Sequence, residues 1–158
     1  MEKKNLTIPY QVAAYEELNE SDKALVEAAR EATYTSYAPY SNFHVGAAVR
    51  MSNNEIIKGS NQENAAFGAG TCAERTTMFY ANAHLPEESI VEIAIAARGT
   101  NGDFTEAAIA PCGICRQALL EAQIRARKPI RALLYGKREI IMVDSISDLL
   151  PFQFDEIV

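Results

Sequence analysis

The stretch "TCAERTTMFY" (residues 71–80) places Cys72 at the opening of a helical run. The stretch "PCGICRQALL" (111–120) places Cys112 and Cys115 three positions apart at the opening of a second helical run. The chain has 3 cysteines in all, so every thiol stands at the start of one of two expected helices. The sulfurs can therefore share a site if the fold brings these two helix starts together.

Helical runs and strands alternate along the rest of the chain. Helices are expected at 20–37, 72–85, 112–125 and 145–151. Strands are expected at 43–51, 55–60, 89–99, 129–136 and 138–145. Ser21 is the expected N-cap of the first helix. The alternation predicts an α/β fold, a three-layer α/β/α sandwich in which helices cover both faces of one mixed five-stranded sheet.

The composition limits the class of protein. The 158 residues, 48% of them hydrophobic, fit a single domain with one core. A net charge of −6 without a Lys/Arg-rich block argues against polynucleotide binding. No apolar run approaches the ~18 residues that span a membrane, and no signal peptide is recognisable. We therefore expect a cytoplasmic protein, and an odd number of cysteines suits a reducing compartment.

The three cysteines can bind a metal ion together. The spacing of Cys112 and Cys115 puts both sulfurs on one side of a first helical turn, where the helix dipole favours the thiolate form. Cys72 opens another helix, and two such helix starts can meet at one end of a sheet. Three thiolates around Zn²⁺ leave the fourth tetrahedral position open for water, as a catalytic zinc site requires.

Other interpretations of these residues stay open at this point. A Cys-x-x-Cys pair alone indicates a redox pair about as well as a metal site, and Cys72 alone is more often a small core residue. A structural zinc site would need a fourth ligand. The 2 histidines, His44 and His84, are isolated in the sequence and are interpreted as non-ligands.

Charged residues beside the cysteines suit the catalytic interpretation. Glu74, two positions after Cys72, can reach a metal-bound water, accept its proton and pass it on. Arg75 can offset the negative charge of three thiolates by hydrogen bonding to sulfur. Arg116, directly after Cys115, can contribute in the same way. The alternative is that all three charged side chains face solvent.

Four motifs, in order along the chain, resemble the cytidine deaminase family. They are "YAPYSNFHVGAA", "GSNQENAAFG", "TCAERTTMF" and "PCGICRQALLE", and the likeness runs from about Tyr37 to about Phe154. Zinc deaminases share the signature H-x-E…P-C-x-x-C, and a cysteine at its first position resembles the small homotetrameric members. The resemblance implies one Zn²⁺ per subunit held by the three cysteines, Glu74 as the catalytic proton carrier, and no organic cofactor.

The resemblance also implies substrate-binding residues. Asn61 and Glu63 would hold the ribose hydroxyls, and an amide with a carboxylate supplies the donor and acceptors for that task. Phe43 would line the nucleoside pocket. Backbone groups near Ala65 and Ala73 would bind the edge of the pyrimidine.

Two further parts of the chain bear on the resemblance. Phe154, with Phe152 as the second candidate, would enter the active site of a neighbouring subunit in the homotetramer. Phe67 stands where many members have tyrosine, and the following loop 68–70 is unusually small. The resemblance implies a domain core at about 21–154, and it gives the N-terminal extension 1–20 no counterpart and therefore no role.

These features predict hydrolytic deamination of cytidine and 2′-deoxycytidine to the corresponding uridines with release of ammonia. One alternative is a deaminase of another cytosine nucleoside such as blasticidin S. Another is a non-catalytic zinc-stabilised binding module. The expected partners are a small nucleoside and other copies of this chain, without a nucleic acid polymer or a membrane.

Overall fold

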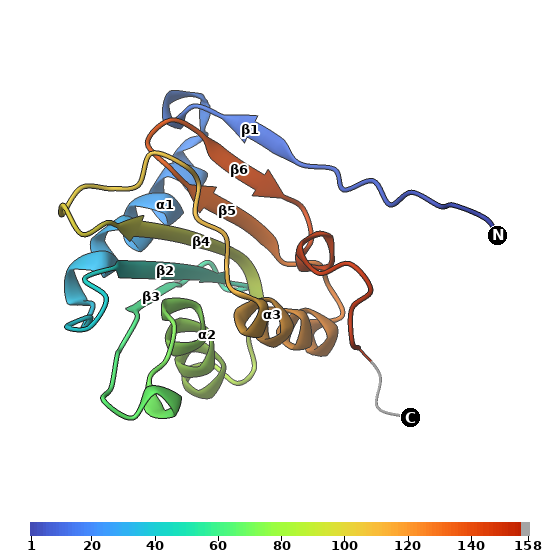
Figure 1. Ribbon diagram of the computed structural model, residues 1–158. Coiled ribbons are helices and arrows are strands. Elements are labelled where there is room, and N and C mark those ends of the chain that lie inside the picture. Colours follow the sequence, from blue (N-terminus) through green and yellow to red (C-terminus); the bar gives the residue numbers. More distant parts are fainter. Residues whose placement is uncertain (156–158) are drawn as a thin grey trace.

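A six-stranded mixed sheet forms the middle layer of the computed structural model, which describes residues 1–155 (Figure 1). The strands are β1 Gln11–Ala13, β2 His44–Met51, β3 Ile56–Ser60, β4 Ile90–Arg98, β5 Arg131–Tyr135 and β6 Ile140–Val143. Their order across the sheet is β1-β6-β5-β4-β2-β3. Within the described chain, β4 and β5 pair in parallel and the other neighbours pair antiparallel. The long connection between the parallel strands carries a helix, as such crossovers require.

Helices cover both faces of this sheet, which confirms the expected three layers. The helix α1, Glu20–Ala32, packs on one face. The helices α2, Ala73–His84, and α3, Gly113–Ala126, lie side by side on the other face. No described helix is long and apolar enough to cross a membrane.

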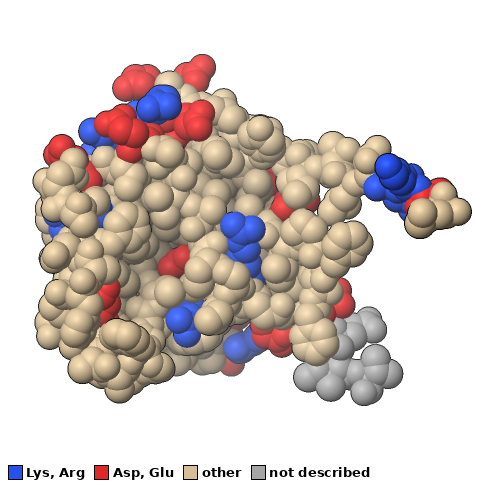
Figure 2. Space-filling view, viewed as in Figure 1, with Lys and Arg blue, Asp and Glu red and all other residues tan. Residues whose placement is uncertain are grey.

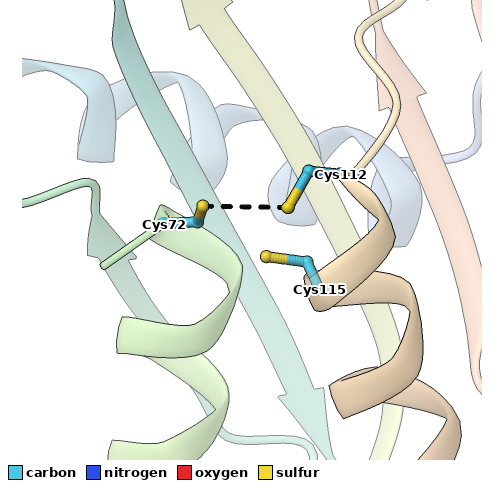
Figure 3. A group of neighbouring side chains, drawn as sticks. All are labelled: Cys72, Cys112 and Cys115. Carbon is cyan, nitrogen blue, oxygen red and sulfur yellow. Dashed lines mark hydrogen bonds between the residues drawn. The ribbon is translucent and has the colours of Figure 1, made fainter. Parts of the chain in front are cut away.

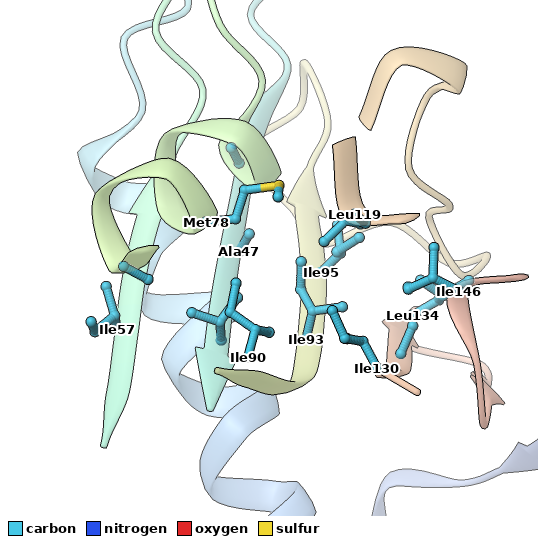
Figure 4. Close-up of a cluster of buried hydrophobic side chains, with 14 of the residues drawn as sticks. Ala47, Ile57, Met78, Ile90, Ile93, Ile95, Leu119, Ile130, Leu134 and Ile146 are labelled. Atoms are coloured by element: carbon cyan, nitrogen blue, oxygen red, sulfur yellow. The ribbon is translucent and has the colours of Figure 1, made fainter. Parts of the chain in front are cut away.

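The larger hydrophobic core lies between the sheet and the α2/α3 layer (Figure 4). Its fully buried side chains come from both layers and include Met78, Ile93, Ile95, Leu119 and Ile130. A second core lies under α1, where Leu25 and Val26 are fully buried. Alternate residues of β4 serve the two cores, so this central strand is apolar on both faces, as the sequence "IVEIAIAAR" indicates.

Close packing of α1 on β2 depends on a glycine. A Cβ atom at Gly46 would lie 2.1 Å from the carbonyl oxygen of Ala29 in α1. Only a residue without a side chain lets the helix backbone approach the strand this closely. This contact fixes α1 against the half of the sheet that also carries the site described below.

The prediction of five strands was one strand short. The sixth, β1, comes from the N-terminal extension and pairs antiparallel with β6, with Gln11 opposite Met142. Three residues are too few to show an alternating pattern, so no periodicity indicated this strand. Residues 1–10 before it are exposed and project away from the body of the molecule (Figures 1 and 2).

Two helix ends also differ from the expectation. The N-cap of α1 is Asn19, whose side chain accepts a hydrogen bond from the backbone N–H of Asp22, and not Ser21. The helix ends at Ala32 and continues as a short 3-10 helix, Thr33–Thr35. Asparagine and serine are comparable caps, so composition alone could not choose between adjacent candidates. The expected last helix is a 3-10 helix, Ile146–Leu149.

Candidate metal centre and active site

The strand directions bring the starts of α2 and α3 to the same end of the sheet. His44 at the start of β2 pairs with Arg98 at the end of β4, and Gly46 pairs with Ser60 at the end of β3. The chain therefore leaves β3 toward α2, and β4 toward α3, at one end of three neighbouring strands. This topology joins cysteines that are far apart in the sequence.

The three sulfurs converge where these helices begin (Figure 3). Cys72 and Cys112 are the N-cap residues of α2 and α3, and Cys115 lies in the first turn of α3. The sulfurs of Cys72 and Cys112 are 3.9 Å apart, and all three sulfurs lie within 4.8 Å of one another. Zn–S bonds of about 2.3 Å in a tetrahedron place sulfurs about 3.8 Å apart. The donor set therefore fits Zn²⁺ in both chemistry and spacing.

Thiol acidity in this cluster is divided unequally between two cysteines. A hydrogen bond from Cys115, with help from Arg75, lowers the pKa of Cys72 to about 5. That same hydrogen bond and burial raise the pKa of Cys115. The cluster therefore favours a thiolate at Cys72, and a bound dication would favour the ionised form at all three sulfurs.

The carboxyl group of Glu74 lies beside the sulfurs and away from water. The residue is the second of α2, it is only 4% exposed, and its side chain is within hydrogen-bonding reach of Cys115. Burial raises its pKa above the usual value, and the nearby Cys72 adds to this effect. A carboxyl group whose pKa is raised toward neutrality can both accept and release a proton, as a general acid–base requires.

The two arginines beside the cysteines behave differently. Arg75 donates from Nη2 to the sulfur of Cys72 at 3.6 Å, which is the contact expected from the sequence. Arg116 donates instead to the carbonyl oxygens of Pro111, at 2.9 Å, and Leu149, at 2.7 Å. The expected contact between Arg116 and sulfur is therefore not made, because these carbonyls occupy its guanidinium. Arg116 ties the start of α3 to the C-terminal 3-10 helix.

A cavity of about 310 Å³ opens beside Cys72 and Arg75, within the usual size range of small-molecule sites. Its lining combines polar side chains with two aromatic rings. The lining residues are Tyr40, Asn61, Gln62, Glu63, Asn64, Phe67, Gly70, Thr71, Cys72 and Arg75. The cavity is thus bounded by the cysteine site on one side and by the loop after β3 on the other.

Backbone hydrogen bonds hold that loop in place. Gln62 and Thr71 exchange two N–H···O bonds of 2.9 Å, which close the loop just before Cys72. Tyr37 donates to the carbonyl of Asn61 and accepts from the N–H of Glu63. The loop is therefore anchored at both ends, and it carries its polar side chains to the cavity.

The expected substrate residues are distributed unevenly around the cavity. Asn61 and Glu63 line it. Phe43, Ala65 and Ala73 are not among the lining residues: Phe43 is half-buried, Ala65 is exposed, and Ala73 is buried at the start of α2. Their implied contacts with a base stay predictions.

The predicted tail residues lie outside this cavity. Phe154 is 65% exposed, and its carbonyl oxygen accepts a hydrogen bond of 2.8 Å from Gln117 of α3. Phe152 is almost fully exposed. Neither ring fills the cavity of its own chain.

Sequence reasoning did not single out Tyr40 and Ser41. Tyr40 lines the cavity and packs edge-on against Phe67, with ring centroids 6.1 Å apart. Ser41 contacts Glu63. Both lie in the motif "YAPYSNFHVGAA", where an aromatic and a hydroxyl residue after a proline could have marked a turn that faces a ligand.

Comparisons with known proteins agree with this geometry. The family model described as "Cytidine and deoxycytidylate deaminase zinc-binding region" matches residues 19–128. A cytidine deaminase of Halalkalibacterium halodurans is 37% identical over 130 residues, which cover 82% of this chain and 91% of the relative. The crystal structure of the cytidine deaminase from Burkholderia pseudomallei is similar, with a TM-score of 0.70 and 36% identity over 83% of this chain and 97% of that one. The structure of the Mycobacterium tuberculosis cytidine deaminase gives a TM-score of 0.67 at 28% identity.

The fold and the three-sulfur site thus define a zinc-dependent deaminase. The chain belongs to the cytidine and deoxycytidylate deaminase family, and it carries one zinc ion per subunit. Its relatives over most of its length are cytidine deaminases.

Proposed function

We infer that this protein is a zinc-dependent cytidine deaminase that converts cytidine and 2′-deoxycytidine to the uridines and releases ammonia. The observation that carries this inference is the cluster of three cysteine sulfurs beside the buried Glu74, one of which, that of Cys72, belongs to a residue lining the cavity. We propose Cys72, Cys112 and Cys115 as the zinc ligands and Arg75 as the group that offsets their charge.

Glu74 is proposed to carry protons during the reaction. Zinc, when bound, supplies a Lewis acid that makes a coordinated water a nucleophile near neutral pH. Glu74 accepts a proton from the attacking water and delivers it to N3 of the base. As the C4–N4 bond breaks, Glu74 transfers a second proton from the water to the departing amine, so that one water is consumed and one ammonia leaves. Its buried position and raised pKa suit both transfers.

The sugar of the substrate is proposed to bind Asn61 and Glu63, since both line the cavity beside Cys72. Phe43 and backbone groups near Ala65 and Ala73 are proposed to contact the base. The sugar-binding and base-binding groups together would recognise a complete nucleoside, because a free base leaves Asn61 and Glu63 without partners.

We further propose a homotetramer in which Phe154 reaches a neighbouring active site. The exposed apolar side chains along α2 and α3 support this, since Phe79 is 55% and Ile114 66% exposed. Contiguous exposed apolar residues of this kind mark interaction sites. A cytoplasmic location is proposed because an acidic thiol cluster needs a reducing compartment.

An ammonia-release assay tests the function. The purified protein is offered cytidine, 2′-deoxycytidine, cytosine and blasticidin S, with and without a zinc chelator. Turnover of the two nucleosides that the chelator abolishes is the expected result. Turnover of blasticidin S alone would reassign the substrate, and no ammonia from any compound would indicate a zinc-stabilised binding module.

A further inference from the structure

Three donors from one short turn converge on the carboxylate of Glu63. The backbone N–H of Tyr40 donates to Oε2 at 2.8 Å, and the N–H of Ser41 donates to the same oxygen at 3.3 Å. The hydroxyl of Ser41 donates to the other oxygen, Oε1. Glu63 is the one acidic residue in the described lining of the cavity.

The hydroxyl of Ser41 is itself oriented. Its oxygen accepts a hydrogen bond of 3.1 Å from the backbone N–H of Phe43. This leaves the hydroxyl proton directed at Glu63, whose own N–H is anchored on the carbonyl of Tyr37 at 2.8 Å. The hydrogen bond from Ser41 is also the largest cause of the lowered pKa of Glu63, so the group stays ionised.

These contacts leave Glu63 one free acceptor position. An ionised carboxylate offers about four acceptor positions on its two oxygens. Oε2 uses two on backbone N–H groups, and Oε1 uses one on the hydroxyl of Ser41. Glu63, which lines the cavity, therefore keeps a single open acceptor position, on Oε1.

The side chain of Asn61 has the opposite capacity: its hydrogen bonds leave a free donor and no free acceptor. Its Oδ1 accepts from the hydroxyl of Ser36 at 2.5 Å and from the N–H of Val45 at 2.9 Å, which fills both of its acceptor positions. One N–H of its Nδ2 donates to the carbonyl of Phe43 at 2.9 Å. One N–H remains, so Asn61 can act on a ligand only as a single donor.

Asn61 and Glu63 line the same cavity, and one free donor with one free acceptor matches one hydroxyl group, which accepts once and donates once. We propose that Ser41 is a positioning residue that fixes the Glu63 carboxylate with one open acceptor beside the free N–H of Asn61, so that the pair selects a sugar hydroxyl of the substrate. This inference rests on the proposed function. It assigns Ser41 no contact with the substrate and no part in the chemistry.

Ser41→Ala tests the proposal because it removes the hydroxyl and leaves both backbone donors to Glu63. We expect KM for cytidine to rise about tenfold, the scale of one lost hydrogen bond to a charged group, with kcat within about twofold, since uniform binding is lost. Ser41→Thr, which keeps the hydroxyl, should restore most of the affinity. Ser52→Ala is the matched control, because Ser52 donates to the Glu88 carboxylate at the opposite end of β2, and it should change neither constant.

Two further measurements separate positioning from general structural damage. The inhibition constant of 2′,3′-dideoxycytidine, which lacks both secondary hydroxyls, should change no more than about twofold in Ser41→Ala. In a Glu63→Gln background, Ser41→Ala should add little further loss, because the two residues act as a unit. Equal penalties for both ligands, or additive effects in the double variant, would overturn the role of Ser41.

The outcomes also distinguish this inference from the proposed function. A wild-type protein that neither deaminates nor binds cytidine overturns both. A wild-type protein that deaminates cytidine, together with a Ser41→Ala variant whose KM is unchanged, overturns the positioning role alone.

Discussion

Glu74 combines burial with a place beside three sulfurs, and each property has a consequence for catalysis. Only 4% of the residue is exposed, so the carboxyl group is removed from the water that would hold it ionised. Burial also raises the pKa of the carboxyl group, which helps it both to accept and to release a proton. A glutamate that faced solvent at this position would have neither property.

Replacing Glu74 by alanine should therefore separate metal binding from turnover. We expect kcat to fall by at least about 10²-fold, the lower end for loss of a general acid–base, with zinc content unchanged. Ammonia release and elemental analysis measure the two quantities. Glu87→Ala, at an exposed position after α2, is the control and should behave as wild type. Near-normal turnover in Glu74→Ala would remove it from the mechanism.

Cys112 offers the sharpest test of the ligand set, since it is the exposed member of the three cysteines. Cys112→Ser exchanges sulfur for a poorer zinc ligand with little change in volume. Elemental analysis should find well under one zinc per chain, and ammonia release should fall with it. A full complement of zinc in this variant would show that the metal lies elsewhere.

Individual residues of the site were predictable to different degrees. The cysteines, Glu74 and Arg75 stand in short motifs at two helix starts, so their meeting in one cluster could be predicted from those motifs. The contacts of Arg116 could not, because its acceptor on Leu149 is far away in the sequence and only the tertiary fold brings it near. The contact of Ser41 with Glu63 escaped for the same reason.

Charged side chains link the start of α1 to three strands. Arg131 of β5 donates to both carboxylate oxygens of Asp22, at 2.7 and 2.9 Å, and to Glu92 at 3.1 Å. Arg50 of β2 donates to Glu92 at 2.8 Å and to the carbonyl of Ser21 at 2.7 Å. These bonds fix the helix over β2, β4 and β5.

Arg131→Met should destabilise the fold, because it leaves the buried carboxylate of Asp22 without its cation. The side chain of Asp22 is only 6% exposed, and removing one partner of a buried pair costs about 3 kcal/mol or more. Chemical denaturation of the zinc-loaded protein measures the loss. Lys58→Ala, which breaks an exposed pair with Glu31, is the matched control and should cost under about 1 kcal/mol. Equal effects of the two substitutions would contradict the network's role.

The elements themselves follow from sequence in proportion to their length and apolar content. The strand β4 has nine residues and was recognisable because both of its faces are buried. The predicted ends of α2 and α3 lie within one residue of the observed ends. Each predicted helix starts at the cysteine that is the observed N-cap. The boundary of α1 was less sharp, as its last turn tightens into a 3-10 helix without a breaking residue.

At the scale of the molecule, the site and the strand β1 lie in different parts of the sheet. The site lies at one end of β3, β2 and β4, whereas β1 lies at the far edge beyond β6 and β5. The family model matches residues 19–128, so it leaves out β5 and β6 as well as β1. Stability and activity should therefore respond differently to loss of this strand.

A chain that begins at Ala14 should be less stable and equally active. Loss of β1 removes its pairing with β6, which we expect to cost about 1–2 kcal/mol from a few backbone hydrogen bonds. Denaturation midpoints and kcat/KM for cytidine measure the two effects. A chain that begins at Tyr10 lacks only the exposed arm and serves as the control, with unchanged stability. A marked loss of kcat/KM in the longer deletion would show that β1 supports the site.

The pairing of β1 with β6 also sets an order of events during synthesis. Gln11 leaves the ribosome long before its partner Met142, which follows far along the chain. The β1 segment therefore stays unpaired while the rest of the sheet assembles from more local contacts. Until β6 emerges and pairs, the β1 segment and the edge of β5 remain open to other chains. Closure of that edge is the step by which the nascent protein completes its sheet.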